Sequence, residues 1–186
     1  IDCVHDLTSD ELDQLGVAPA VYLNTNYVRA VATMDAVYEF DAKRFNLSRR
    51  EVLAMDPQHR IFLEGAVHSL EDAGYDPDRS DKNVGVFGGC WLPSYEKTLP
   101  APDPADLADQ LLRETGCDKD YLPMRVSYLL GLTGPSLAIQ TSCSTSAAAV
   151  AIACTSLLAK QCNSALAGAC SIAYNQRGYS FVEGMP

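Results

Sequence analysis

The sequence predicts an α/β fold, in which strands alternate with helices. Three short apolar runs of strand length occupy residues 83–89, 136–140 and 165–172. The segments between them show either helical spacing of apolar residues or a long run of small residues. Strands and helices that alternate in this way form a layered domain around a largely parallel sheet. The 186 residues, 47% of them hydrophobic, are enough for one substantial core.

The first part of the chain is predicted to be rich in loops, with an extended stretch at 25–28. Residues 48–51 have the spacing of a capping box and predict the start of a short helix. Asp56 and Pro57 then supply an N-cap and a first helical residue for a longer helix, which Gly74 ends. The face of this helix predicted to lie on the core carries Phe62, Ala66, Ser69, Leu70 and Ala73.

Beyond the long helix, further elements are expected in alternation. In chain order they are a strand at 83–89, a proline-rich loop at 99–104, helices at 105–115 and 121–130, a strand at 136–140, a long helix at 144–160 and a strand at 165–172. The strand at 83–89 is almost entirely apolar and ends in glycines, which is typical of a buried, central, parallel strand. Gly85, Gly88 and Gly89 do not have the G-x-G-x-x-G spacing of a dinucleotide-binding loop.

Composition excludes two classes of partner. The net charge is −10, and no run of Lys or Arg is dense enough to follow a phosphate backbone, so we expect no nucleic acid. The longest apolar stretch, residues 147–159, is too short to span a bilayer and is interrupted by polar residues, so we expect no membrane partner.

The cysteines indicate a reducing environment. They are seven in number, with no C-x-x-C pair and only three histidines beside them, which fits neither a disulfide framework nor a zinc site. We therefore expect free thiols, a cytoplasmic protein, and no bound metal or cofactor. Cys154, Cys162 and Cys170 are predicted to be buried and to act as small hydrophobic residues.

Cys143 is the candidate catalytic nucleophile. It lies in a polar turn between the strand at 136–140 and the helix that begins at Ser144. Free N–H groups and the positive end of a helix dipole favour a thiolate at such a junction. The amide of Cys143 is also a candidate donor of an oxyanion hole. The small neighbours Ser142, Ser144 and Ala147 leave room for an acyl chain.

Two polar residues of the long helix have structural interpretations. His59, beside Arg60, is predicted to form structural hydrogen bonds rather than to act in catalysis. Asp56 is predicted to cap the helix rather than to act as an acid, because Pro57 follows it directly.

Four motifs in a fixed order resemble the β-ketoacyl synthase family, and specifically the ketosynthase domains of modular polyketide synthases. They are MDPQHR at 55–60, RVSY at 125–128 with GPS at 134–136, QTSCSTS at 140–146 and LAGA at 166–169. The similarity runs from about residue 27 to residue 186, and residues 183–185 resemble the stretch that leads into the loop after the family's nucleophile. The resemblance implies a thiolase-like fold with α-β-α-β-α layers. This chain would be most of its first half, a partial N-terminal domain over residues 1–186 that is truncated at both ends and lacks the first strand.

The resemblance also implies a reaction. The cysteine matching Cys143 would accept an acyl group from the phosphopantetheine arm of an acyl carrier protein. It would then transfer the acyl group to a carbanion formed by decarboxylation of a malonyl-type thioester, in a decarboxylative Claisen condensation. The implied partners are acyl carrier protein, neighbouring polyketide synthase domains and a second copy of the chain, paired around residues 136–140. Fatty acid synthases belong to the same family.

Departures from the family pattern leave alternatives open. Ser142 stands where the family usually has Ala, and Ala169 where it has Gly; both keep a small side chain. The family's two histidines and lysine that drive condensation belong to the second half, and His5, His59 and His68 match none of them. The chain alone is therefore expected to be inactive.

One alternative function is that of a non-condensing relative that transfers acyl groups or serves dimerisation. The other is an unrelated cysteine hydrolase, which would require a histidine after Cys143, and none follows.

Overall fold

The computed structural model describes residues 3–77, 81–174 and 176–181. The chain forms two compact units, one of Ile1–Val37 with Ala173–Pro186 and one of Tyr38–Ile172. Each unit is described by itself. The resemblance at residues 183–185 lies outside the described residues.

The larger unit is built on a parallel sheet of three strands in the order β5-β4-β6. The central strand, β4 (Val84–Cys90), is buried along its whole length. It pairs with β5 (Ser136–Ala138) on one side and with β6 (Ser164–Cys170) on the other, both in parallel. The prediction of a buried, central, parallel strand is therefore confirmed, and Gly85, Gly88 and Gly89 lie within this strand and not in a nucleotide-binding loop.

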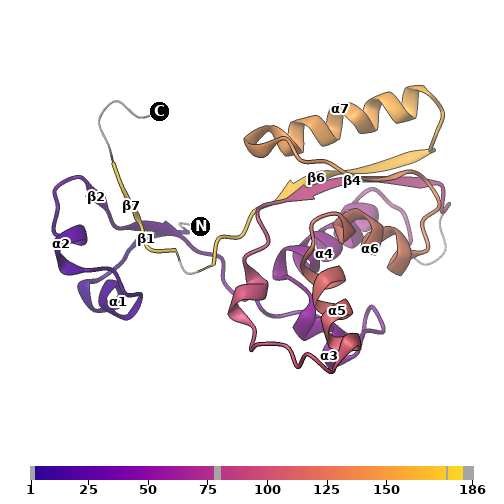
Figure 1. Ribbon diagram of the computed structural model, residues 1–186. Helices are drawn as coiled ribbons and strands as arrows, with labels where there is room; N and C mark the ends of the chain where they lie inside the picture. Colours follow the sequence, from indigo (N-terminus) through magenta and orange to yellow (C-terminus); the bar gives the residue numbers. More distant parts are fainter. Residues whose placement is uncertain (1–2, 78–80, 175, 182–186) are drawn as a thin grey trace. The chain divides into compact units, whose positions relative to one another are not determined.

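Helices cover both faces of this sheet (Figure 1). On one face lie α4 (Pro57–Asp72) and α6 (Tyr121–Leu130), whose side chains pack with Val84 and Val86. On the other face lies α7 (Thr145–Leu158), against which Phe87 packs. Side chains of successive strand residues point to opposite faces, so β4 contributes to both apolar clusters. The predicted α/β layering is confirmed.

The helix ends follow the predicted capping chemistry. At α3 (Arg49–Ala54), the hydroxyl of Ser48 accepts from the Glu51 N–H at 3.3 Å, and the Glu51 carboxylate accepts from the Ser48 N–H at 2.8 Å. At α4, the Asp56 carboxylate accepts from the Gln58 N–H at 2.8 Å, so the helix-cap role of Asp56 is confirmed. Gly131 adopts a left-handed conformation with φ of 65° and ends α6, as predicted.

The predicted core face of α4 was partly wrong. Ser69 and Ala73 are exposed, and the residues of α4 that pack in the core are Leu63, Ala66, Val67 and Leu70. The buried face is rotated from the predicted one. Phe62 is half-buried and packs against the edge of the core, and together with Ser69 it lines a groove of about 270 Å³ beside β6. Periodicity alone did not show which side of the helix the sheet would occupy.

Between α4 and α7 the remaining elements are close to the predicted ones. A 3₁₀ helix, η1 (Tyr95–Thr98), precedes the proline-rich loop. The next helix, α5 (Leu107–Cys117), starts later than predicted because the carboxylate of Asp106 caps it by accepting from the Asp109 N–H at 2.9 Å.

The smaller unit has more regular structure than predicted. Strands β1 (Val4–Asp6) and β3 (Ala30–Ala32) pair antiparallel, as do β2 (Tyr27–Val28) and β7 (Tyr179–Ser180). Two short helices, α1 (Ser9–Gln14) and α2 (Pro19–Tyr22), lie between β1 and β2. The capping box of Thr8 and Glu11 at the start of α1 is a sequence signal that the loop-rich prediction missed.

The helix α7 carries apolar side chains on every side, on the face toward the sheet and on the exposed face alike. Its buried residues, among them Ala149 and Ala153, face the sheet, whereas Val150 and Leu158 are exposed. The predicted burial of Cys154 was wrong: its thiol is exposed, because the described sheet covers only one side of this helix. Cys162 is buried as predicted, and Cys170 is half-buried. An apolar surface of this kind is typical of a helix that a further layer covers.

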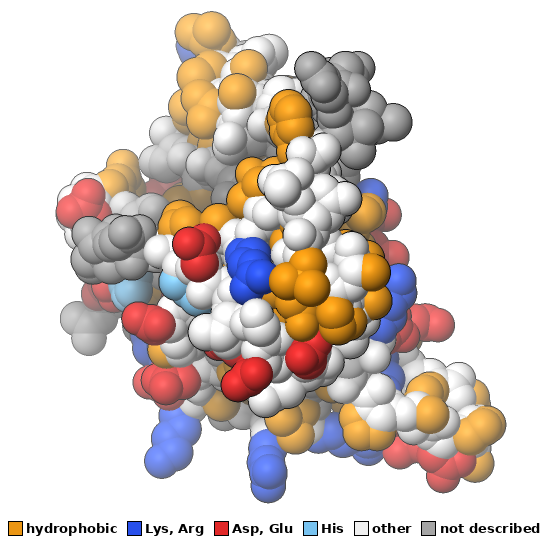
Figure 2. Space-filling view, turned by 90° about the vertical axis from the view of Figure 1, so that its left-hand side faces the viewer, with side chains coloured by type: hydrophobic (Ala, Val, Ile, Leu, Met, Phe, Trp, Pro, Cys, Tyr) orange, Lys and Arg blue, Asp and Glu red, His pale blue; other side chains and the backbone are white. Residues whose placement is uncertain are grey.

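Charged side chains of both signs share the face of the molecule drawn in Figure 2. Figure 2 shows Asp and Glu side chains interspersed with Lys and Arg on one face, with hydrophobic side chains between them. Within the described ranges, the helices are all too short or too polar to span a bilayer.

Candidate active site

The turn that carries Cys143 connects β5 to α7. It contains a short 3₁₀ segment, η2 (Ser142–Ser144), and Ser142 adopts a left-handed conformation with φ of 56°. The Thr145 hydroxyl accepts from the Thr141 N–H at 3.0 Å and donates to the Ser142 carbonyl at 2.8 Å. The Ser144 hydroxyl donates to the Thr141 carbonyl at 2.7 Å. These bonds hold the turn in a conformation that a non-glycine residue such as Ser142 rarely adopts.

Cys143 faces a cavity of about 560 Å³. The thiol is exposed, and its sulfur lies 3.9 Å from the Ser142 hydroxyl. The cavity is formed by the ends of β4 and β6, by the Cys143 turn and by Lys119; its lining residues are Cys90, Trp91, Leu92, Lys119, Gln140, Ser142, Cys143, Thr145, Ser146, Ala169, Cys170 and Ser171. Ligands of open α/β sheets bind beyond the carboxyl ends of parallel strands, which is where this cavity lies.

Of the small residues predicted to leave room near the thiol, Ser142 lines the cavity, whereas Ser144 and Ala147 are not part of its lining. Ala169, the second position that departs from the family pattern, does line it. Each position that departs from the pattern therefore adds a small group to the wall of the cavity.

Gly89 allows the strand and the turn to approach each other. A Cβ atom at this position would overlap the carbonyl oxygen of Ile139 and the methyl group of Thr145. Ile139 precedes the turn, and the Thr145 hydroxyl closes it. The Cys143 turn can therefore lie where it does only because residue 89 has no side chain. The sequence indicated a close approach at the end of this strand, without identifying its partner.

The other two thiols of the cavity are held in the protonated form. Burial, with the negative charge of Asp56 as a smaller cause, raises the pKa of Cys90 to about 12. Burial also raises the pKa of Cys170, whose thiol donates to the Gln58 carbonyl at 3.3 Å. Because the thiolate is the nucleophilic form, Cys143 is the cavity cysteine best suited to attack.

None of the three histidines contributes to the lining of the cavity. His5 and His68 are exposed on β1 and α4, and neither these two residues nor His59 line the cavity. His59 is buried as a structural residue, but the hydrogen bonds predicted for it are not formed: neither ring nitrogen has a partner among the described residues. Burial, with the positive charge of Arg125 as a smaller cause, lowers the pKa of His59 to about 3.

Replacing His59 by leucine should make the protein less sensitive to acid. The folded state keeps His59 neutral down to a pKa of about 3, whereas the unfolded chain binds the proton near the ordinary value of 6.5. Above pH 6.5 the histidine is neutral in both states, and the free energy of unfolding is unaffected. As the pH falls from 6.5 toward 3, protonation of the unfolded chain lowers the free energy of unfolding. Between pH 7.5 and pH 5 the His59→Leu variant should therefore lose about 2 kcal/mol less free energy of unfolding than the wild type.

Urea denaturation at the two pH values measures this difference. His68→Leu is the matched control, because His68 is exposed on the same helix and its variant should retain the full acid sensitivity. Equal losses in the wild type and in His59→Leu would show that His59 does not set the acid sensitivity.

Comparisons with known proteins agree with this geometry. The chain matches the family described as "Beta-ketoacyl synthase, N-terminal domain" over residues 1–185. The match includes the first 26 residues, to which the resemblance seen in the sequence did not extend.

Several similar proteins are polyketide synthases. A subunit of the phenolphthiocerol/phthiocerol polyketide synthase of Mycobacterium tuberculosis is 42% identical over 182 residues, covering 93% of this chain and 12% of that protein. Erythronolide synthase EryA3 of Saccharopolyspora erythraea is 37% identical over 175 residues, covering 92% of this chain and 5% of that protein. The chain thus spans only a small part of these relatives.

Similar solved structures are ketosynthases. Ketosynthase twelve of the bacillaene polyketide synthase of Bacillus amyloliquefaciens matches with a TM-score of 0.85 and 28% identity, covering 98% of this chain and 32% of that chain. The ketosynthase from module 1 of the bacillaene synthase of the same species matches with a TM-score of 0.76 and 26% identity, covering 91% of this chain and 29% of that chain. The thiolase-like fold is therefore shown, and the chain covers about a third of a ketosynthase. With its sequence matched almost from end to end, the chain belongs to the β-ketoacyl synthase family, whose N-terminal domain residues 1–185 match.

Proposed function

We propose that the protein containing this chain is a ketosynthase of a modular polyketide synthase, and that Cys143 carries its acyl intermediate. The observation that supports this most directly is the position of the exposed Cys143 thiol on the cavity at the carboxyl ends of β4 and β6. A thioester requires a nucleophile that is also a good leaving group, and a cysteine thiolate is both.

The first step of the proposed reaction loads the thiol. The thiolate of Cys143 attacks the carbonyl carbon of an acyl group on the phosphopantetheine arm of an acyl carrier protein. The tetrahedral intermediate collapses, the carrier thiolate leaves, and the acyl group remains on Cys143. The N–H of Cys143 makes no hydrogen bond to a described residue, so it is available to stabilise the oxyanion.

The second step forms the carbon–carbon bond. A malonyl-type thioester on a carrier protein loses CO₂, and its electron pair attacks the acyl carbon on Cys143. The sulfur leaves as a thiolate, and a β-keto thioester remains on the carrier. No histidine of this chain lines the cavity, and the proposal therefore assigns the assistance of decarboxylation to groups outside this chain.

The proposal includes acyl carrier protein, neighbouring polyketide synthase domains and a second copy of the chain as partners, with no membrane or nucleic acid. Pairing of two copies at β5 is supported by its position at the edge of the described sheet and by the exposure of Leu137. Tyr128 and Met124 expose further apolar area on the neighbouring α6.

A cytoplasmic location is consistent with seven free thiols. The domain itself is proposed to need no cofactor.

A turnover experiment on the intact protein tests the proposed function. We expect octanoyl-pantetheine to transfer its acyl group to Cys143, and malonyl-pantetheine added afterwards to yield CO₂ and a β-keto thioester. Mass spectrometry follows both the enzyme and the product. An acyl group that stays on Cys143 without CO₂ release would instead identify a non-condensing acyltransferase. Transfer of the acyl group to water, with no stable acyl-enzyme and no new carbon–carbon bond, would indicate a hydrolase.

A further inference from the structure

Gln58 lies beneath the Cys143 cavity without lining it. It is the residue after Pro57 in the first turn of α4, and its side chain is 0% exposed. A fully buried amide costs free energy unless its polar atoms are hydrogen-bonded, so its partners indicate its role.

The partners of the Gln58 side chain come from the ends of two strands. Its Oε1 atom accepts from the Trp91 N–H at 3.0 Å and from the Ile172 N–H at 3.2 Å. Its Nε2 atom donates to the Trp91 carbonyl at 3.5 Å. Trp91 directly follows β4, and Ile172 lies just beyond the end of β6. One side chain therefore connects two segments that are far apart in the sequence.

These bonds continue the sheet where the strand pairing ends. The last pair in register is Cys90 with Cys170, and the Trp91 N–H also donates to the Cys170 carbonyl at 3.1 Å. Beyond this point Ile172 bonds to Gln58 instead of to β4. The Gln58 amide thus takes the place of the next backbone hydrogen bond that would otherwise join the two strands.

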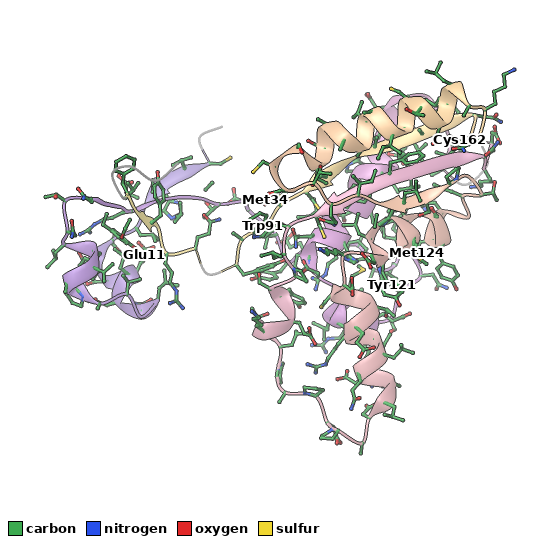
Figure 3. All side chains as sticks on the ribbon, turned by 45° about the horizontal axis from the view of Figure 1, so that its top comes forward. Glu11, Met34, Trp91, Tyr121, Met124 and Cys162 are labelled. Carbon is green, nitrogen blue, oxygen red and sulfur yellow. The ribbon has the colours of Figure 1, made fainter. Side chains whose placement is uncertain are left out.

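The segments that Gln58 connects form two walls of the cavity. Trp91 and Leu92 contribute the wall that follows β4, while Cys170 and Ser171 contribute the wall that follows β6. In Figure 3 Trp91 lies at this end of the sheet, and Cys162, which precedes β6, lies at the opposite end. The distance between the walls depends on where the two backbones separate, and the Gln58 amide fixes that point.

We infer that Gln58 is a positioning residue, which sets the width of the cavity and thereby controls how bulky acyl groups reach Cys143. This inference rests on the proposed function. Without the amide, the Ile172 N–H loses its acceptor and the Trp91 N–H keeps only its bond to the Cys170 carbonyl, so the two strand ends are held together less firmly. A long acyl chain contacts both walls and is affected, whereas an acetyl group near the thiol is not. A displacement of about 1 Å at a reacting group is enough to cost a large factor in rate.

The test uses the intact protein, three variants of Gln58 and one control variant. Gln58→Met keeps the volume but has no amide, Gln58→Asn keeps an amide that is one carbon too short, and Gln58→Glu keeps an acceptor oxygen. Gln161→Met is the matched control, because Gln161 is exposed beyond the end of α7. The rate constants for acylation of Cys143 by acetyl-pantetheine and octanoyl-pantetheine are compared, and hydrogen exchange is measured at the amides of Trp91 and Ile172.

We expect Gln58→Met and Gln58→Asn to slow octanoylation by roughly tenfold more than acetylation. Amide exchange should become faster at Trp91 and Ile172 and stay unchanged within β4, and Gln58→Glu should restore at least part of both effects. Equal slowing with the two acyl groups, or unchanged exchange at the two amides, overturns the inference. The proposed function is tested separately: it fails if neither thioester acylates the wild-type protein. In that case the exchange measurement still decides whether the Gln58 amide holds the two strand ends together.

Discussion

Replacing Cys143 by alanine should abolish formation of the acyl-enzyme in the protein that contains this chain. The thiol faces the cavity, and its sulfur is the atom that would form the thioester bond. Replacing Cys143 by serine should have nearly the same effect. A hydroxyl group is a poor nucleophile without an adjacent base, and no histidine lines the described cavity.

The expected loss is large because no neighbouring thiol can substitute. Burial raises the pKa of Cys90 to about 12, so only about one molecule in ten thousand carries the Cys90 thiolate near pH 8. Burial likewise raises the pKa of Cys170. We therefore expect Cys143→Ala to reduce the acylation rate by at least about a thousandfold.

Mass spectrometry of the protein after incubation with octanoyl-pantetheine measures this loss, and peptide mapping locates the acyl group. Cys154→Ala is the matched control, because Cys154 is also an exposed thiol but lies on the outer side of α7, away from the cavity. It should be acylated at the wild-type rate. An acyl group on another cysteine, or equal acylation of Cys143→Ala and wild type, would refute the assignment of Cys143 as nucleophile.

Elements with local signals were predicted well. The caps at Ser48 and Asp56 involve partners only two or three residues away, so their residue types were enough to place α3 and α4. The apolar run of β4 was long enough to show that the strand is buried. The smaller unit has strands of two or three residues, too short for a periodic pattern to develop, and the loop-rich prediction failed there.

The surroundings of Cys143 could not be predicted in the same way. The strand, turn and helix around it are continuous in sequence, so the candidate nucleophile could be identified from its own segment. Trp91 and Cys170 reach the cavity from the ends of β4 and β6, and the parallel register of these strands brings them together there. Lys119 reaches the cavity from the connection between α5 and α6. The Gln58 amide reaches Trp91 and Ile172 across 33 and 114 residues of sequence. Neither distance leaves a local pattern.

Replacing Gly89 by alanine should be among the most destabilising single changes in the chain. The new Cβ atom would overlap the Ile139 carbonyl oxygen, which belongs to the backbone and cannot rotate away, as well as the Thr145 methyl group. Relief requires β4 to separate from the segment that leads into the Cys143 turn. Such overpacking in a close-packed interior costs about 3 kcal/mol of free energy of unfolding or more.

The same displacement should reach the thiol. Moving Ile139 and Thr145 shifts the residues on both sides of the Cys143 turn, and the Thr145 hydroxyl closes that turn through its bonds to Thr141 and Ser142. We therefore expect Gly89→Ala to lower the rate of Cys143 acylation even at temperatures where the variant stays folded.

Gly168→Ala is the control, because Gly168 lies on the adjacent strand β6 and a Cβ atom there would meet nothing within 4 Å. Urea denaturation and the acylation rate compare the two variants. If Gly89→Ala is as stable as Gly168→Ala and as fast in acylation, the close approach of β4 to Ile139 does not position the thiol. If it loses stability and reacts slowly while Gly168→Ala does neither, the strand and the nucleophile are coupled through this contact, which depends on residue 89 having no side chain.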